Sequence, residues 1–204
     1  MSSEKERSVW KNVLAVTGSI GCGKSSVMRL LEQRGYVCAS ADQISRSLLE
    51  AGTETYAAVV SHFGPGVAGV HGSIDRKALG RMVFSDPARR KVLEEILHPA
   101  IERRALEFFS DQLARNNFKL AYEVPLLFEA GLEKRGFGRI LLVTAAQEVR
   151  IERIMERDGL SAEEVLKRMR AQLPEEIKIP QSDVVIDNSS DLASLAAQLD
   201  AEGL

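Results

Sequence analysis

The chain has few of the features that mark secreted or membrane proteins. Only two of its 204 residues are cysteines, Cys22 and Cys38, which is too few for a disulfide framework. No run approaches the roughly 18 apolar residues of a membrane span, and residues 1–11 lack the apolar stretch of a secretory signal. These absences favour a cytoplasmic protein, and we expect residues 1–11 to form a flexible tail.

The sequence also lacks an excess of charge of either sign. Its 27 Lys and Arg residues nearly balance 29 Asp and Glu residues, which gives a formal net charge of -2. Nothing therefore attracts the chain as a whole to nucleic acid or to an anionic membrane surface, and we expect neither as a partner. With 45% hydrophobic residues the chain can form one globular core. We expect a single domain over residues 12–204 and favour a monomer.

A glycine-rich loop near the start of the chain indicates phosphate binding. Residues 18–25 (GSIGCGKS) fill the pattern G-x-x-x-x-G-K-[ST], directly after the apolar run 13–16. Glycines let backbone amides turn inward, and the helix that begins near Lys24 adds the positive end of its dipole. We expect ATP, with Lys24 at its outer phosphates and the Ser25 hydroxyl on Mg²⁺. The predicted nucleotide-binding residues are Gly18, Ser19, Ile20, Gly21, Cys22, Gly23, Lys24, Ser25 and Ser26.

Apolar strands and amphipathic helices alternate along the chain. Strands are predicted at residues 13–17, 36–39, 118–124, 139–144 and 183–187. Helix starts are predicted at Asp86-Pro87, at Ser161 with Glu164 as a capping box, and at Asp191. His98-Pro99 separates the first of these helices from a further one over 101–113. This order predicts an α/β fold, a five-stranded parallel sheet with helices on both faces.

A phosphate-binding loop indicates a nucleotide but does not specify a reaction. The chain has no Asn-Lys-x-Asp guanine motif and no Gly-Gly-Gln transporter signature, and it is too short for the relay domains of a motor. These absences favour a metabolite kinase. A kinase of the same fold acting on a nucleoside monophosphate or a small polyol is an alternative, and a non-catalytic nucleotide-binding switch is another.

Two acidic residues follow or end predicted strands, where ligands of open parallel sheets bind. Asp42, beyond the second strand, is the candidate base that accepts the proton of the acceptor hydroxyl, although it could also cap the next helix. Glu123 ends the third strand and is a candidate magnesium ligand or an edge residue in water. Arg153 and Arg157 are four residues apart on a helix and are predicted to close over the transferring phosphate as part of a lid. A solvated charged face is the competing interpretation.

Six motifs together resemble the dephospho-CoA kinase family over about residues 12–200. They are residues 17–25 (TGSIGCGKS), 41–42 (AD), 74–79 (IDRKAL), 97–99 (LHP), 125–129 (PLLFE) and 185–188 (VIDN). The resemblance implies phosphorylation by ATP of the ribose 3′-hydroxyl of dephospho-CoA, which gives CoA and ADP in the last step of CoA synthesis. It also implies a P-loop kinase core over 12–42 and 117–204, a helical acceptor-binding insertion over about 43–116, and a lid over about 150–175.

The resemblance extends to individual residues. It implies Asp42 as the catalytic base and an acceptor surface of Asp42, Arg76, His98, Pro125, Leu126, Leu127 and Glu129. Ser40 stands where the family usually has the first of two aspartates, so this chain could hold its metal differently. Cys22 occupies a position of the loop that takes small residues, and its small size is the first interpretation. It also lies at the start of a helix, which can lower the pKa of a thiol, and oxidation of Cys22 that blocks ATP binding is a second hypothesis.

Overall fold

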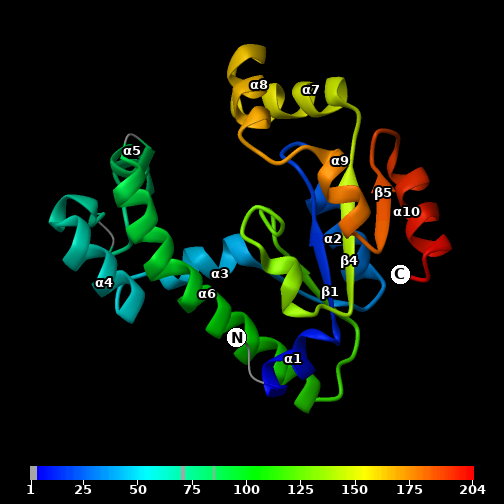
Figure 1. Ribbon diagram of the computed structural model, residues 1–204, viewed down its shortest axis with the longest axis horizontal. Helices are drawn as coiled ribbons and strands as arrows, with labels where there is room; N and C mark the ends of the chain where they lie inside the picture. Colours follow the sequence, from blue (N-terminus) through cyan, green and yellow to red (C-terminus); the bar gives the residue numbers. More distant parts are fainter. Residues whose placement is uncertain (1–3, 70–71, 85) are drawn as a thin grey trace. The chain divides into compact units, whose positions relative to one another are not determined.

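The computed structural model describes residues 4–69, 72–84 and 86–204 (Figure 1). The chain forms two compact units. Met1–Ser40 and Phe109–Leu204 make up the first unit, and Ala41–Phe108 makes up the second. The second unit overlaps the predicted helical insertion.

The first unit is built on a five-stranded, entirely parallel sheet in the order β2-β3-β1-β4-β5. The strands are β1 (Val13–Thr17), β2 (Val37–Ser40), β3 (Leu120–Glu123), β4 (Arg139–Thr144) and β5 (Val184–Asp187). All five residues of β1 and the four central residues of β4 are buried, as expected for strands covered on both faces. The predicted fold class is confirmed.

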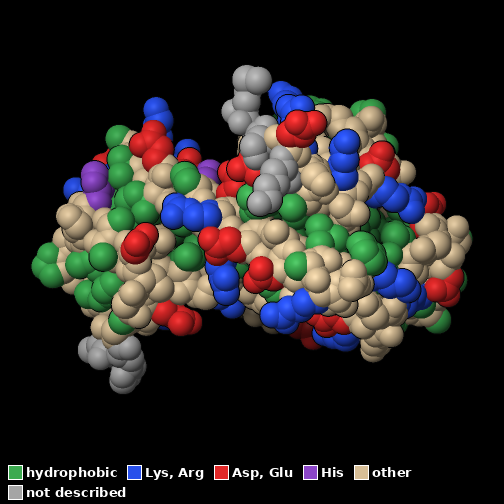
Figure 2. Space-filling view, turned by 90° about the horizontal axis from the view of Figure 1, so that it is seen from below, with side chains coloured by type: hydrophobic (Ala, Val, Ile, Leu, Met, Phe, Trp, Pro, Cys, Tyr) green, Lys and Arg blue, Asp and Glu red, His purple; other side chains and the backbone are tan. Residues whose placement is uncertain are grey.

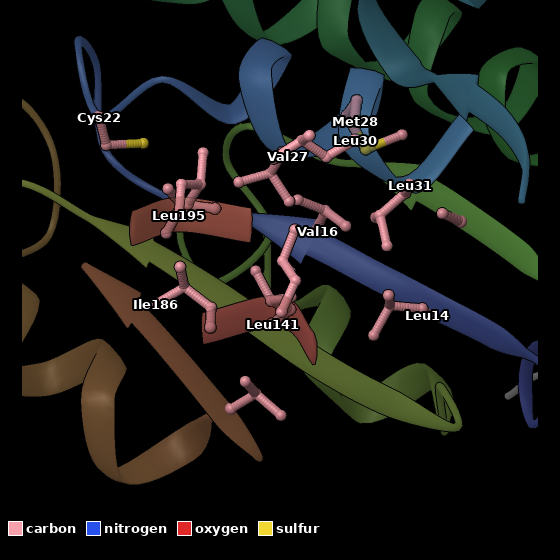
Figure 3. Packing of buried hydrophobic residues seen from close by; sticks show 14 of the residues in the cluster. Leu14, Val16, Cys22, Val27, Met28, Leu30, Leu31, Leu141, Ile186 and Leu195 are labelled. Carbon is pink, nitrogen blue, oxygen red and sulfur yellow. The ribbon is translucent and has the colours of Figure 1, made fainter. Parts of the chain in front are cut away.

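Two helices cover one face of the sheet. Helices α2 (Lys24–Gln33) and α10 (Leu192–Ala201) pack against alternate residues of the strands, and Figure 3 shows this core from close by. Leu14, Val16 and Leu141 of the sheet belong to the same buried cluster as Val27 of α2 and Leu195 of α10. The N-terminal end of α2, which follows the glycine-rich loop, is therefore fixed relative to the strands by apolar packing.

The N-terminal segment differs from the prediction of a flexible tail. Residues Glu4–Trp10 form helix α1, and Trp10 is only 1% exposed. Its ring lies 5.9 Å from Phe109, 5.9 Å from Tyr122 and 5.2 Å from Phe137 between centroids. The tail prediction is wrong for these residues because burial of a large aromatic ring stabilises the helix; residues 1–3 of the predicted tail lie outside the described part of the chain.

The remaining helices of the first unit lie in its C-terminal half. They are α7 (Gln147–Asp158), α8 (Ala162–Arg170) and α9 (Glu175–Lys178), with short 3-10 turns at Leu132–Arg135 and Ile179–Gln181. Ser161 and Glu164 form the predicted capping box at the start of α8. Asp191 accepts a hydrogen bond from the backbone of Ser194, and this confirms the predicted start of α10.

The second unit is helical. It contains α3 (Ala41–Leu48), α4 (Glu54–Phe63), α5 (Arg76–Phe84), a 3-10 turn at Pro65–Val67, and residues 87–108 of α6 (Pro87–Ala114). Helix α6 does not stop at Pro99, contrary to the sequence prediction. Apolar residues of its first part, including Leu93 and Ile96, pack against the core of the second unit, while Phe109 near its end contacts Trp10. This packing offsets the roughly 3 kcal/mol that an interior proline costs.

In the described part of the chain, no helix is both long enough and apolar enough to cross a membrane. On the face shown in Figure 2, Lys and Arg side chains are interspersed with Asp and Glu side chains. Charge is thus mixed over this face, as the near-zero net charge suggests.

Candidate active site around the glycine-rich loop

The glycine-rich loop joins β1 to α2 and has a backbone that requires glycine. Gly18, Gly21 and Gly23 have φ angles of 150°, 81° and 85°. A side chain would also lack space, because a Cβ atom at Gly18 would collide with the carbonyl oxygen of Val143, and one at Gly23 with Nδ2 of Asn188. The loop therefore lies against β4 and against the residue that follows β5.

The two residues expected to contact phosphate and magnesium lie in the first turn of α2. The Lys24 ammonium donates to the carbonyl oxygens of Gly18 at 2.8 Å and of Ser19 at 3.3 Å, so its charge is held at the loop itself. Ser25 is exposed. A cation, a hydroxyl and a helix N-terminus at one glycine-rich loop form a site suited to a polyphosphate.

Four side chains that the sequence did not predict as site residues hold the loop in place. Asn188 donates to the carbonyl oxygen of Cys22 at 2.8 Å, and Arg150 donates to that of Ile20 at 3.0 Å. The Gln172 side chain accepts the N–H of Ile20 at 2.8 Å, and buried Lys178 donates to the Ser19 hydroxyl at 3.4 Å. Only Asn188 carried a sequence signal, as part of the 185–188 motif.

The two arginines predicted to act together have different environments. Nη1 of Arg153 is buried and has no hydrogen-bond partner among the described residues, and it lies 3.5 Å from the position of a Cβ atom on Gly23. Arg157 instead pairs with Asp158 through two hydrogen bonds of 2.8 and 2.9 Å, and its side chain is 62% exposed. The structure thus brings Arg153 to the loop and shows Arg157 bound to another partner.

Glu123 lies at the carboxyl end of β3, the strand between β2 and β1. Its Cα pairs in register with Val16 on one side and with Ser40 on the other. A carboxylate therefore stands directly beside the position where the sequence has Ser40 in place of an expected acid. Asp42 follows β2 by two residues and is an exposed residue in the first turn of α3, in the second unit.

The residues predicted to bind the acceptor differ in their exposure to solvent. Arg76 and His98 are exposed on α5 and α6 of the second unit. In the segment after β3, Pro125 is half-buried and Leu126 is 48% exposed, whereas Leu127 has no exposed surface and serves as core. The side chain of Leu127 therefore presents no surface to a ligand in this structure.

Glu129 is engaged inside the first unit. Its Oε1 atom lies 2.7 Å from the Lys178 ammonium and accepts the backbone N–H of Leu173 at 3.1 Å. Its carboxylate is thus part of the support of the glycine-rich loop through Lys178. Contact between Glu129 and an acceptor stays a prediction.

The hypothesis of a reactive Cys22 is wrong. The side chain has no exposed surface, and burial raises the pKa of the Cys22 thiol despite the nearby Lys24 ammonium. A low-pKa, accessible thiolate is what selective oxidation requires. Cys22 is a small buried residue that fills space beneath the loop.

Comparison with known proteins identifies the family. The family model for dephospho-CoA kinase matches residues 12–194. The chain belongs to the dephospho-CoA kinase family. A dephospho-CoA kinase of Parasynechococcus marenigrum is 42% identical over 193 residues, which cover 94% of each chain. A solved protein of Thermus thermophilus has 40% identity and a TM-score of 0.77, with 93% of this chain and 95% of that chain covered.

A second solved structure, a dephospho-CoA kinase from Campylobacter jejuni, is 31% identical with a TM-score of 0.69 and 94% coverage of both chains. The dephospho-CoA kinases are enzymes, and their matches span nearly all of this chain. Membership of this family favours a catalyst of phosphoryl transfer to a small molecule over a nucleotide-binding switch.

Proposed function

We propose that this dephospho-CoA kinase family member transfers the γ-phosphoryl group of ATP to the ribose 3′-hydroxyl of dephospho-CoA, giving CoA and ADP. The observation that carries the proposal is the glycine-rich loop, whose backbone and Lys24 form a site for a polyphosphate in a chain of this family. The acceptor is inferred from the family, because the loop alone is compatible with many phosphate acceptors.

The loop and Lys24 bind and orient the triphosphate. Backbone amides at the start of α2 and the Lys24 ammonium place positive charge against the β- and γ-phosphates, where negative charge shifts during transfer. Because the loop is fixed before ATP arrives, little reorganisation is needed in the transition state. Positioning and charge stabilisation therefore supply most of the rate enhancement.

Asp42 is the proposed base for the acceptor hydroxyl. A carboxylate in the first turn of α3, directly after β2, follows the strand end at which ligands of such sheets bind. It would accept the proton of the 3′-hydroxyl as the oxygen attacks phosphorus in line with the leaving ADP oxygen. General-base help of this kind contributes roughly 10²- to 10⁴-fold.

Mg²⁺ fits the oxygen donors near the loop. Mg²⁺ in nucleotide sites takes one or two protein oxygens together with phosphate oxygens and water. The exposed Ser25 hydroxyl and the Glu123 carboxylate at the end of β3 are such donors, and Glu123 lies beside Ser40, where the acid typical of the family is missing. The ion would neutralise phosphate charge; Ser25 and Glu123 would hold it.

Arg153 is the proposed partner of the transferring phosphate. Its buried Nη1 has no hydrogen-bond partner among the described residues, and such an unsatisfied charged donor is costly unless an anion arrives. A guanidinium beside Gly23 would stabilise the charge on the γ-phosphoryl oxygens and help to exclude water, which would otherwise accept the phosphate.

The proposal is tested by incubating the protein with ATP, Mg²⁺ and a set of acceptors. The set contains dephospho-CoA, nucleoside monophosphates, shikimate and gluconate, and each product is identified by mass. We expect one added phosphate on dephospho-CoA, on the ribose 3′-oxygen by NMR, and none on the others. Phosphorylation of another acceptor, or ATP hydrolysis that is independent of every acceptor, would contradict the proposal.

A further inference from the structure

A seven-residue segment, residues 172–178, is linked to the first turn of the phosphate loop at three points. Gln172 accepts the Ile20 N–H at 2.8 Å, and Lys178 donates to the Ser19 hydroxyl at 3.4 Å. The third link is indirect: Glu175 pairs with Arg150 at 2.7 Å, and Arg150 donates to the Ile20 carbonyl oxygen at 3.0 Å. Gln172 holds the N–H group of Ile20, and Glu175 holds its carbonyl oxygen through Arg150. Lys178 holds the side chain of Ser19.

The burial of the Lys178 cation is not explained by fold stability alone. The residue is 1% exposed, and its ammonium is balanced by Glu129 at 2.7 Å. A buried ion pair is a weak contributor to stability, since a well-packed apolar pair of the same volume serves as well or better. Fold stability alone therefore does not account for a cation at this place, whereas contact with the loop does.

We propose that residues 172–178 form a clamp that holds the first turn of the phosphate loop in the shape that receives ATP, with Gln172 and Lys178 as its positioning residues. The inference rests on the proposed use of ATP. A glycine-rich loop samples many backbone conformations when it is unrestrained. Binding must then supply the ordering entropy, so a loop that is ordered beforehand binds its ligand more tightly.

The clamp makes a specific kinetic prediction. Gln172 and Lys178 contact the loop and are not placed on the reacting atoms, so their loss should weaken ATP binding and leave the acceptor site unchanged. The KM for ATP should rise, and the KM for dephospho-CoA should stay constant. A residue with a merely structural role would instead lower the amount of active protein without changing either constant.

The first variant is Gln172→Ala, with Glu176→Gln as the matched control. Glu176 is exposed and lies four residues further along the same segment, in α9. Calorimetry with a non-hydrolysable ATP analogue and Mg²⁺ should give a dissociation constant about threefold to tenfold higher for Gln172→Ala, as expected for one lost hydrogen bond. Glu176→Gln should bind the analogue like the unmodified protein, and both variants should remain folded by circular dichroism.

The second variant replaces the ion pair. Lys178→Met alone would leave the Glu129 carboxylate buried without its cation, which is strongly destabilising. The double variant Lys178→Met with Glu129→Gln removes both charges and keeps an oxygen that accepts the Leu173 N–H. We expect it to stay folded by circular dichroism and to bind the analogue at least threefold more weakly.

The outcomes separate the clamp from the proposed function. Weaker analogue binding in both variants, with an unchanged KM for dephospho-CoA in Gln172→Ala, is the expected result. If both folded variants bind the analogue like the unmodified protein, the clamp is wrong while the proposed function stands. If the unmodified protein itself does not bind the analogue, both the proposed function and the clamp are wrong.

Discussion

Replacing Gly23 by Ala probes the loop at its most crowded point. Gly23 is the N-cap residue of α2 and has a φ of 85°, and a Cβ atom there would collide with Nδ2 of Asn188. Gly35, just beyond the other end of α2, has nearly the same φ of 83°, and no described atom lies within 4 Å of its Cβ position. Both positions therefore have the same backbone strain, but only Gly23 has an atom in collision with its Cβ position.

The backbone strain and the collision determine how much each substitution lowers the free energy of unfolding. A left-handed conformation costs a non-glycine residue about 1–2 kcal/mol, and we expect Gly35→Ala to lower the free energy of unfolding by that amount. Forced overpacking adds about 1–3 kcal/mol, so Gly23→Ala should lower it by about 2–5 kcal/mol in total. Because Asn188 would have to move, its hydrogen bond to the Cys22 carbonyl oxygen should be lost as well.

Urea unfolding followed by circular dichroism measures both free energies. Calorimetric binding of ATP then shows whether the loop still functions, and we expect Gly23→Ala to bind at least tenfold more weakly and Gly35→Ala to bind normally. Gly23→Ala that proves no less stable than Gly35→Ala and binds ATP normally would refute the crowded loop geometry.

Three further results are expected. Trp10→Ala should lower the free energy of unfolding by about 3–5 kcal/mol, since its ring is buried against three aromatic rings; a change under 1 kcal/mol would show that α1 is not docked. At pH 8 the thiols of the native protein should resist iodoacetamide. Burial raises the pKa of Cys22 and raises that of Cys38 to about 12, which lowers the fraction of Cys38 present as thiolate roughly 10³-fold. Rapid alkylation before unfolding would contradict this prediction. Arg153→Ala should lower turnover by about 10²- to 10³-fold, and Arg157→Ala by less than tenfold; equal losses would contradict the different environments of these two side chains.

Local sequence signals predicted the sheet and its loop well. The strands at 13–17 and 139–144 were predicted with their observed ends, because a strand buried on both faces is a continuous apolar run between polar residues. Capping residues such as Ser161 and Asp191 were equally clear, since a cap acts on amides two or three positions away. In each case the physical cause lies within a few residues of its effect.

Features that depend on distant partners were missed. Helix α1 is stabilised by Trp10, whose partners lie about 100 residues or more further along the chain. Helix α6 continues through Pro99 because packing overrides the local cost of proline. Gln172 and Lys178 reach loop residues 152 and 159 positions away, and no spacing rule connects residues so far apart.

The most direct measurement of the central claim is the single-turnover rate of Asp42→Asn with ATP, Mg²⁺ and dephospho-CoA. The variant keeps the size of the side chain and removes the proton acceptor. We predict a rate about 10²- to 10⁴-fold below that of the unmodified protein, with an unchanged dissociation constant for ATP. A rate within threefold of the unmodified protein would remove Asp42 from the reaction and contradict the proposed mechanism.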